Sequence, residues 1–272
     1  MNNFADKVVI VTGGNSGIGR GTVLSFAKEE AKVVIVGRNE KTLNETVEIL
    51  KNNNIKEENY IVVQCDLTDE KSPKTIIDKT IEKYGKIDVL VNNAGQPGKA
   101  GVKDITSLEL YDHVFRINLR AVVMLSEAVL PYLIKTKGNI VNVSSIASTV
   151  PSLTENGEFM FYSMSKAALD MYTKSLAGRV SLHNVRVNSI NPGYIATPIF
   201  SKLSSDKENV ITSEDPIIEM KDFIEAYVPM KRFGTVEEIA NFITFIASDQ
   251  ASFNTGSINY VDGGFLIRPV SQ

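Results

Sequence analysis

Tyr162 and Lys166, four residues apart in the segment YSMSK, are the side chains whose spacing most clearly suggests chemistry. On a helix this spacing places both on one face, where their polar ends can converge. A phenol has a pKa of about 10, and each unit by which it falls needs about 1.36 kcal/mol of stabilisation of the anion. The Lys166 ammonium can supply that field, so the pair could exchange a proton near neutral pH.

Two serines, Ser144 and Ser145, end the segment NIVNVSS, whose apolar run predicts a buried strand. The carboxyl ends of strands in a parallel sheet face the ligand crevice, so Ser145 is a candidate for holding a substrate oxygen. Taken singly, each feature has an ordinary alternative. Tyr162 and Lys166 could be an amphipathic surface pair, and the serines could be a turn or a helix cap.

A glycine-rich turn, TGGNSGIG from Thr12 to Gly19, joins the expected first strand to the expected first helix. Glycines permit positive φ and the close approach of a pyrophosphate, and the free amides at a helix start favour negative charge. The spacing of Gly13, Gly17 and Gly19 differs from the G-x-G-x-x-G fingerprint of long-chain Rossmann enzymes. The turn therefore predicts a nucleotide-phosphate site, with a turn that binds no ligand as the alternative.

Gly37 and Arg38 close the expected second strand, at the place where a carboxylate would bind the ribose 2′-hydroxyl of NAD. A guanidinium at this place can instead bind a 2′-phosphate through charge-assisted hydrogen bonds. We therefore expect NADP(H) as the cofactor, and NAD(H) less so. The alternative is that Arg38 is a solvated loop residue and that Glu40 approaches the ribose.

Apolar runs alternate with helical patterns along the chain and predict an α/β fold. The strand runs are continuously apolar, which is typical of a parallel sheet with helices on both faces. We expect one doubly wound Rossmann-type domain over residues 1–272, with a seven-stranded parallel sheet. The expected strands are Lys7–Thr12, Lys32–Val36, Tyr60–Gln64, Ile87–Val91, Asn139–Val143, Val185–Ile190 and Ser257–Val261. The expected helices are Gly19–Lys28, Glu40–Lys51, Pro73–Tyr84, Leu108–Lys135 (read as two helices that meet near Asn118), Tyr162–Leu182 and Val236–Ala247.

The stretch from Pro192 to Thr235 breaks this alternation with prolines and polar residues. Loops of this length in compact domains are usually functional. We therefore interpret residues 193–234 as a substrate loop and not as a second domain, with a variable surface excursion as the alternative.

Taken in order, these motifs resemble the short-chain dehydrogenase/reductase family, in its compact single-domain branch, over nearly the whole chain. The turn TGGNSGIG is similar to the family's cofactor turn, and Ser145, Tyr162 and Lys166 are similar to its serine and its YxxxK pair. Further matches are Asn92-Asn93-Ala94-Gly95 to the NNAG motif, Asn118 to the helix asparagine, Asn191-Pro192-Gly193 to the PG motif, and Val261-Asp262-Gly263-Gly264 to the closing strand. Each motif is weak alone, and their order makes the resemblance specific.

The resemblance implies an oxidoreductase that interconverts a carbonyl and an alcohol by hydride transfer. It implies that Tyr162 donates a proton to the carbonyl oxygen during reduction and acts as the base in oxidation. Lys166 would bind the nicotinamide ribose and bias Tyr162 toward its anion. Ser145 would orient the substrate oxygen, and Asn118 would hold a water in a proton relay.

The same resemblance outlines the cofactor site. It places Asp66 beside the adenine and Thr197 where the nicotinamide carboxamide is commonly held. The residues expected to bind the cofactor are Gly13, Asn15, Ser16, Gly17, Ile18, Gly19, Arg38, Asp66, Leu67, Asn93, Ala94, Gly95, Tyr162, Lys166, Pro192, Gly193, Ile195 and Thr197. No metal is expected, because His113, His183 and Cys65 show no metal-ligand spacing.

The chain departs from the family in one place. Sixteen residues, from Ile146 to Phe161, separate Ser145 from Tyr162, which is slightly more than usual, and the segment TENGEF is the expected insertion. The choice of Ser145 over Ser144 therefore rests on the NxSS pattern. The added loop should lie at the mouth of the site, where it could shape substrate choice or be a harmless surface insertion.

Composition limits the classes of protein further. Of 272 residues, 43% are hydrophobic and 22% charged, which allows a sizeable core. A net charge of -3 with scattered basic residues argues against a nucleic-acid partner. The lone Cys65 excludes an intrachain disulfide and fits the cytoplasm. The start MNNFADK lacks a basic or apolar stretch, and no later segment is expected to be long enough to span a bilayer, so we expect no membrane partner.

Substrate and assembly are the least defined. The candidate pocket is mostly apolar, so a lipophilic ketone, aldehyde or secondary alcohol fits better than a small charged acid, although several of its side chains could simply be core. Its residues are Ile146, Val150, Pro151, Phe159, Phe161, Tyr194, Ile195, Ile199 and Phe200. The resemblance suggests a homotetramer, with a homodimer as the alternative.

Two other classes of protein stay open. A catalytically idle member of the family could serve as a nucleotide sensor or scaffold, since fold alone does not imply function. The intact set of Asn118, Ser145, Tyr162 and Lys166 favours catalysis. A nucleoside-dependent methyltransferase is disfavoured by the cofactor turn together with the YxxxK pair.

Overall fold

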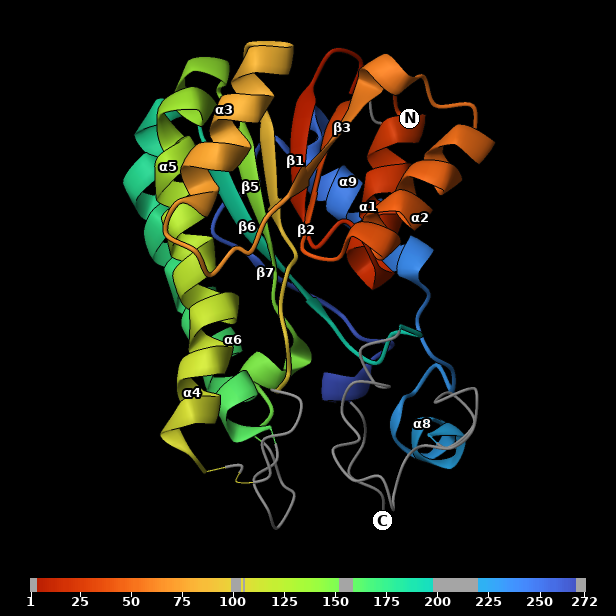
Figure 1. Cartoon of the computed structure of the whole chain (residues 1–272). Helices are drawn as coiled ribbons and strands as arrows, with labels where there is room; N and C mark the ends of the chain where they lie inside the picture. The colour runs from red at the N-terminus through yellow and green to blue at the C-terminus, as the bar shows by residue number, and fades with distance from the viewer. Residues whose placement is uncertain (1–3, 99–103, 105, 152–158, 198–219, 268–272) are drawn as a thin grey trace.

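Seven strands form one parallel sheet at the centre of the computed structural model, which describes residues 4–98, 104, 106–151, 159–197 and 220–267. Their order is β3-β2-β1-β4-β5-β6-β7, so the winding reverses between β1 and β4 (Figure 1). They are β1 Val8–Thr12, β2 Lys32–Gly37, β3 Tyr60–Gln64, β4 Val89–Asn92, β5 Asn139–Val143, β6 Arg186–Pro192 and β7 Ile258–Val261. The predicted doubly wound sheet of seven parallel strands is confirmed.

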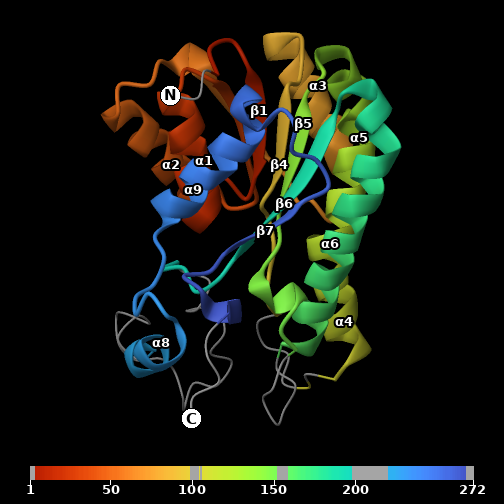
Figure 2. The same ribbon diagram turned by 180° about the vertical axis from the view of Figure 1, so that it is seen from behind.

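Helices cover both faces of this sheet (Figures 1 and 2). One layer holds α1 Gly17–Lys28, α2 Glu40–Asn52 and α9 Val236–Ala247, and the other holds α3 Ser72–Tyr84, α4 Leu108–Phe115, α5 Ala121–Thr136 and α6 Met160–Val180. Every residue of β1 and of β5 is buried. Strand β1 (VVIVT) is apolar up to its last residue because both faces of the strand are covered, and β5 (NIVNV) buries two asparagines as well.

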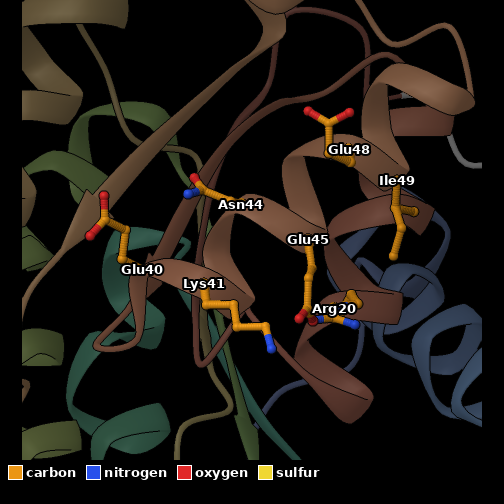
Figure 3. Close-up of a pocket in the computed structure, with 7 residues that line it drawn as sticks. All are labelled: Arg20, Glu40, Lys41, Asn44, Glu45, Glu48 and Ile49. Atoms are coloured by element: carbon orange, nitrogen blue, oxygen red, sulfur yellow. The ribbon is translucent and has the colours of Figure 1, made fainter.

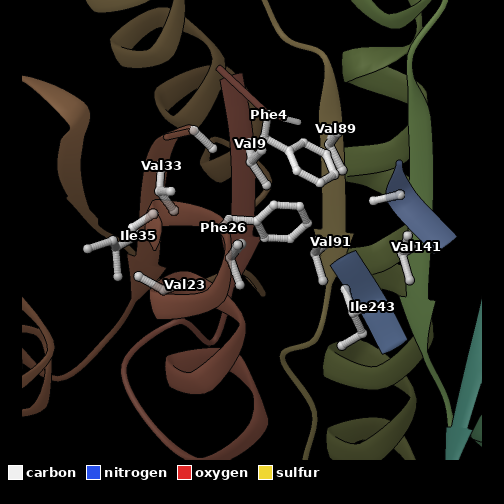
Figure 4. Close-up of a cluster of buried hydrophobic side chains, with 14 of the residues drawn as sticks. Phe4, Val9, Val23, Phe26, Val33, Ile35, Val89, Val91, Val141 and Ile243 are labelled. Carbon is white, nitrogen blue, oxygen red and sulfur yellow. The ribbon is translucent and has the colours of Figure 1, made fainter. Parts of the chain in front are cut away.

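The core lies in two clusters, one on each face of the sheet. Between the sheet and α1, the fully buried Phe26 meets Phe4 edge to face, with 4.8 Å between ring centroids (Figure 4). Val9 of β1 and Ile243 of α9 complete this packing. On the other face, side chains such as Leu125 of α5 pack against the central strands. Burying each such side chain contributes about 1.5–3 kcal/mol, and the two clusters hold the sheet rigidly between its helices.

The region from Leu108 to Thr136 confirms one prediction and corrects another. Helices α4 and α5 meet at a π-helical turn, Arg116–Arg120, which contains Asn118, so the predicted junction near Asn118 is confirmed. This stretch is also long and apolar enough to cross a membrane by length and composition, so the prediction that no segment reaches that length was wrong. Half of its most apolar window is buried within the protein, as in a core helix.

Several predicted boundaries differ from those of the structure. Strand β4 begins at Val89 and not at Ile87, and α1 begins at Gly17, after an extended Ser16. Helix α6 runs from Met160 to Val180, and Leu182 lies beyond it in a 3-10 turn with 91% of its surface exposed. The predicted helix ran on to Leu182 because a sequence shows that a residue is apolar but does not show whether it is buried.

The predicted substrate loop, residues 193–234, is described only in part. Residues 198–219, which include Ile199 and Phe200, lie outside the described residues. The described ends meet, since the amide of Gly234 donates to the carbonyl of Tyr194 at 2.9 Å and Ile195 forms a bridge with Gly234. Between them, α8 spans Lys221–Tyr227 and lies beyond the carboxyl ends of the strands (Figure 1).

Candidate active site

The carboxyl ends of the central strands carry the polar segments that the sequence singled out. The glycine-rich turn follows β1, Asn93 follows β4, Ser145 follows β5 and Gly193 follows β6. Because β1, β4, β5 and β6 are adjacent in the sheet, all four segments lie along one edge. The reversal of winding between β1 and β4 opens the crevice at which ligands bind in sheets of this kind.

Backbone geometry shapes the glycine-rich turn. Gly13 and Gly17 adopt φ of 64° and 49°, in the left-handed region that favours glycine. A Cβ at Gly19 would collide with the carbonyl oxygen of Gly13, so the start of α1 can pack against the turn only without a side chain. Ser16 is the N-cap of α1, and its side chain does not cap the first helical amides. The turn thus offers bare backbone and a helix start, which is the arrangement that suits a phosphate.

Arg20, which the sequence interpretation did not include, holds this turn from behind. Its Nη2 atom donates to the carbonyl of Asn15 at 2.7 Å and to that of Thr42 at 3.2 Å, and it pairs with Glu45 at 2.8 Å. The Asn15 side chain donates to the Thr42 hydroxyl at 2.6 Å. The turn is therefore fastened to α2, which no local sequence pattern indicates.

A shallow groove lies on the outer side of α1 and α2, and Arg20 and Glu45 face each other in it (Figure 3). Its lining residues are Arg20, Glu40, Lys41, Asn44, Glu45, Glu48 and Ile49. None of the predicted catalytic residues lines this groove. Its charges of both signs are typical of a solvated helix face.

Thr12, the last residue of β1, fastens the segment Asn93-Ala94 to the sheet. The Thr12 hydroxyl accepts from the amides of Asn93 at 2.9 Å and Ala94 at 3.1 Å and donates to the carbonyl of Val91 at 3.3 Å. The Asn93 side chain donates to the Thr12 carbonyl at 2.9 Å. Two segments predicted to bind cofactor are thereby fixed side by side.

Arg38 and Asp66 meet at the ends of β2 and β3, with 3.7 Å between Nη1 and Oδ2 and each side chain about half exposed. Burial raises the pKa of Asp66, but hydrogen bonds from Thr68 and the charge of Arg38 outweigh it, so this pKa lies below its usual value. The neighbouring Leu67 is buried. A cation and a carboxylate thus lie together at the place predicted for the adenosine.

Lys166 and Tyr162 lie in the first two turns of α6. The Lys166 ammonium is buried, donates to the carbonyl of Val143 at 2.8 Å and lies 5.7 Å from the centre of the Tyr162 ring. Burial lowers the pKa of Lys166 to about 8, and the charge of Asp170 opposes this fall. Burial raises the pKa of Tyr162 above its usual value, and a hydrogen bond with Ser145 offsets only part of this rise. The two polar ends converge beside the end of β5.

Ser144 and Ser145 point in different directions. The Ser144 side chain is buried, and its hydroxyl donates to the carbonyl of Lys166 at 3.2 Å, which fastens β5 to α6. The Ser145 hydroxyl accepts from the amide of Ala147 at 3.1 Å and forms the hydrogen bond with Tyr162. The geometry brings Ser145, and not Ser144, to the phenol.

Asn118 lies in the π turn and is fully buried. Its Oδ1 atom accepts from the amide of Gln96 at 2.8 Å, and its Nδ2 atom donates to the carbonyl of Gln96 at 2.9 Å and to the hydroxyl of Ser165 at 3.0 Å. These contacts use both amide hydrogens. The side chain therefore holds the loop after Gly95 against α6, a positioning role that was not predicted.

The β6 end closes the site from the other side. Gly193 packs so tightly that a Cβ would lie 2.8 Å from the Cα of Asp262, and its amide donates to the carbonyl of Val261 at 3.0 Å. Ile195 is buried, and Thr197 is the last described residue before the gap at 198–219. Gly193 is thus held against β7, and the residues that follow it pair with Gly234.

The predicted substrate pocket is brought together only in part. Ile146 is buried in a small apolar cluster with Val228 and Phe265. Tyr194 packs against Phe265, with 5.2 Å between ring centroids, and Phe161 packs against Tyr111, with 5.4 Å between ring centroids. Val150, Phe159 and Phe161 are partly buried, and Pro151 is exposed. The described part of the predicted pocket is therefore divided between two separate aromatic groups.

Comparisons with known proteins cover the whole of this fold. A family model described as enoyl-(acyl carrier protein) reductase matches residues 13–266. The chain is 35% identical over 262 residues to a 3-oxoacyl-[acyl-carrier-protein] reductase of Thermotoga maritima, which covers 96% of this chain and 98% of the relative. It is 33% identical over 270 residues to glucose 1-dehydrogenase 2 of Bacillus subtilis, covering 98% and 97%.

Two solved structures are similar to the chain over nearly its full length. One is a short-chain dehydrogenase/reductase of unknown function from Caenorhabditis elegans with cofactor, at a TM-score of 0.87 and 34% identity, covering 98% of this chain and 97% of the other. The second is L-sorbose reductase from Gluconobacter frateurii complexed with NADPH and L-sorbose, at a TM-score of 0.86 and 31% identity, covering 99% and 100%.

Proposed function

This chain belongs to the short-chain dehydrogenase/reductase family, and we propose that it is an NADP(H)-dependent oxidoreductase that interconverts a carbonyl and an alcohol. The observation that carries the proposal is the convergence of three groups at the end of β5. The buried Lys166 ammonium lies beside the Tyr162 ring, and Ser145 is hydrogen-bonded to the phenol. A buried cation beside a phenol favours the anion that acid–base work near neutral pH requires.

The glycine-rich turn fits a dinucleotide, because a side chain at Gly19 would fill the space against Gly13 and the backbone there is bare. The turn would hold the pyrophosphate, Asn93 and Gly95 would face the nicotinamide half, and Lys166 would bind the ribose hydroxyls. Bound NADP(H) would supply the hydride in reduction and accept it in oxidation. The groups that bind and the groups that transfer protons thus share one edge of the sheet.

In the reductive direction, Tyr162 donates its phenolic proton to the carbonyl oxygen as that oxygen gains electron density. The phenolate that remains is stabilised by the Lys166 ammonium and by the Ser145 hydroxyl. In the oxidative direction the same phenolate removes the proton of the alcohol. Ser145 would also orient the substrate oxygen, since its hydroxyl lies against the phenol.

The π turn gives Asn118 a role in proton supply through its backbone. A π turn replaces a hydrogen bond of the α-helix by a longer one, here from the amide of Ala121 to the carbonyl of Arg116, and so changes which carbonyls are free. Because the Asn118 side chain is engaged by Gln96 and Ser165, a relay water would bind the backbone of this turn.

Arg38 supports the preference for NADP(H), since its guanidinium lies at the end of β2 where the adenosine ribose would lie. Asp66 would compete with a 2′-phosphate for the Arg38 guanidinium. The two side chains are 3.7 Å apart and about half exposed, so their ion pair is weak and a phosphate can replace the carboxylate. The similar L-sorbose reductase binds NADPH.

The apolar cluster around Ile146 and the rings of Tyr194 and Phe161 favour a lipophilic ketone, aldehyde or secondary alcohol as substrate. A sugar is the second candidate. It is favoured by the polar contact of Gln96 Oε1 with His113 Nε2 at 2.6 Å, next to Asn118, and by relatives named for glucose and sorbose. A screen of NADPH oxidation over lipophilic ketones, quinones, acyl-thioesters and ketoses would separate the two.

Replacement of the phenol tests the function directly. Tyr162→Phe should reduce turnover by at least about a hundredfold, because general acid catalysis typically contributes that much, and should leave NADPH binding nearly unchanged. The readouts are NADPH oxidation with the best carbonyl of the screen and NADPH titration in a calorimeter. Retained turnover would contradict the proposal, and NADPH binding without turnover in the unmodified protein would favour an idle, nucleotide-sensing member of the family.

We further propose a cytoplasmic homotetramer, with a homodimer as the alternative. The outer face of α6 exposes Met164 and Met171, with 45% and 62% of their surfaces accessible, which is the kind of apolar surface that a second copy can cover. Light scattering of the purified protein would report a mass of four or two chains. A monomer would contradict this part of the proposal.

A further inference from the structure

Asp170 is a buried carboxylate that the proton transfer described above does not use. It lies on α6, one helical turn after Lys166, and only 7% of its surface is exposed. A carboxylate is costly to bury unless it is paired and hydrogen-bonded. Its surroundings should therefore show what it is bound to.

Two residues of β6 bind this carboxylate. Asn191 donates from Nδ2 to Asp170 Oδ2 at 2.7 Å, and the Ser189 hydroxyl lies 3.0 Å from Asp170 Oδ1 and 2.6 Å from Asn191 Oδ1. The same Asn191 nitrogen lies 3.1 Å from the carbonyl oxygen of Ser145 and 2.9 Å from the Ser148 hydroxyl. Asp170 is thus linked through one side chain to the backbone of the serine that meets the phenol.

Lys166 is the cation within reach of this carboxylate. Both residues are buried on α6, with Asp170 four positions after Lys166, and the lysine ammonium also contacts the Tyr162 ring and the Val143 carbonyl at the end of β5. Near the loop after β4, the uncharged Asn118 side chain shares the space beside Gly95 with the lysine. Among the described residues, Asp170 is the charged group that counteracts the effect of burial on the lysine.

We propose that Asp170 is a positioning residue for the proton-transfer pair. Its carboxylate keeps Lys166 in the ammonium form and, through Asn191, fixes the backbone of Ser145 beside Tyr162. That Asp170 contributes to catalysis rests on the proposed function. The coupling between Asp170 and Lys166 is a property of the folded protein with or without turnover, so it can be tested separately.

Asp170→Asn removes the charge and keeps the shape. The amide oxygen of the variant can accept from Asn191, and its NH2 group can donate to the Ser189 oxygen, so the ring of hydrogen bonds can be retained. Asp88→Asn is the matched control. Asp88 is a carboxylate with 5% exposure that directly precedes β4, at the end of the sheet away from the candidate site. It accepts from the amide of Val8 and pairs with Lys86.

A double-mutant cycle on unfolding tests the coupling without substrate or cofactor. Urea midpoints are measured for Asp170→Asn, Lys166→Met and the double variant at about pH 7, where the lysine is charged, and at about pH 10, where it is neutral. We expect Asp170→Asn to lower the midpoint at about pH 7 less in the Lys166→Met background than alone, and the two losses to converge at about pH 10. Equal losses in both backgrounds at about pH 7 would overturn the proposal. Asp88→Asn should give equal losses in both backgrounds.

NADPH binding followed by fluorescence over the same pH range tests the consequence for the site. The affinity of Asp170→Asn should begin to fall at a lower pH than that of the unmodified protein, because its Lys166 loses the proton earlier. An unchanged pH dependence would overturn the proposed role of the charge. If the unmodified protein does not bind NADPH at all, the proposed function fails, and the unfolding cycle still decides the coupling.

Discussion

The Lys166 ammonium nitrogen lies 2.8 Å from the carbonyl oxygen of Val143, the last residue of β5. A strand end therefore fixes one hydrogen bond of a lysine that lies on a helix. Because the ammonium has three donors, this bond orients the group and leaves two hydrogens for other partners. In the proposed function this lysine would serve both the phenol and a cofactor ribose, and the bond to β5 holds it in place for both.

The pH dependence of reduction should follow Lys166. Burial lowers its pKa to about 8, so the ammonium is present below that pH and is lost as the pH rises through it. We expect kcat/KM for NADPH-dependent reduction to fall above about pH 8, because kcat/KM reports the ionisation of the free enzyme. Initial rates over the alkaline range measure this, and a profile that stays flat to about pH 10 would contradict it.

Cofactor preference should depend on Arg38. Replacing it by alanine removes a charge-assisted bond to a 2′-phosphate, which contributes about 1.5–3 kcal/mol, and should weaken NADPH binding roughly tenfold or more. NADH binding should change little. Calorimetric titrations with both cofactors measure the ratio. Arg179→Ala is the control, because Arg179 is a similarly exposed arginine that pairs with Glu127 at 2.7 Å on α5. Equal losses for NADPH and NADH would argue against the assignment.

The hydrogen bonds of the Thr12 hydroxyl with the amides of Asn93 and Ala94 should contribute both to stability and to cofactor binding. Thr12→Val leaves the amides of Asn93 and Ala94 without their acceptor, which should cost about 1–3 kcal/mol of unfolding free energy. Urea unfolding measures this loss, and NADPH titration measures the accompanying loss of affinity. Thr12→Ser keeps the hydroxyl and should restore most of both. A valine variant as stable as the unmodified protein would contradict the contribution of the hydroxyl.

Two glycine-to-alanine substitutions should affect different properties of the protein, one its NADPH binding and the other its stability. Gly19→Ala should greatly weaken NADPH binding, because the added Cβ collides with the Gly13 carbonyl and must distort the turn. Gly178→Ala, on the exposed side of α6 where a Cβ meets nothing within 4 Å, should raise the unfolding free energy by about 0.5–1 kcal/mol. Urea midpoints and NADPH titration compare the two. A Gly19→Ala protein with normal NADPH affinity would contradict the phosphate-binding role of the turn.

Local sequence patterns were sufficient for the sheet and for much of the candidate site. The strands could be predicted because both faces are buried and the apolar runs are therefore continuous, as in β1 and β2. Tyr162 and Lys166 could be paired because residues four positions apart lie on the same face of a helix. The choice between Ser144 and Ser145 is supported by the hydrogen bonds of the two hydroxyls.

The supporting residues could not be predicted because their partners are distant in the chain. Thr12 binds an amide 81 residues away, and Arg20 reaches a hydroxyl 26 residues away on the next helix. Asp170 carried one weak signal, a carboxylate four residues after the lysine on a helix face that should be buried. Such contacts arise from the packing of α2, α6 and β6, which periodicity does not describe.

The π turn at Arg116–Arg120 has a consequence for insertions and deletions in this protein. Each helical residue adds about 100° of rotation, so the one extra residue in the turn rotates α4 relative to α5 by that amount. Removing a single residue there would restore a regular helix and turn Asn118 away from Gln96, while the apolar stripe of α5 still faced the sheet. The length of this segment is therefore as constrained as its composition.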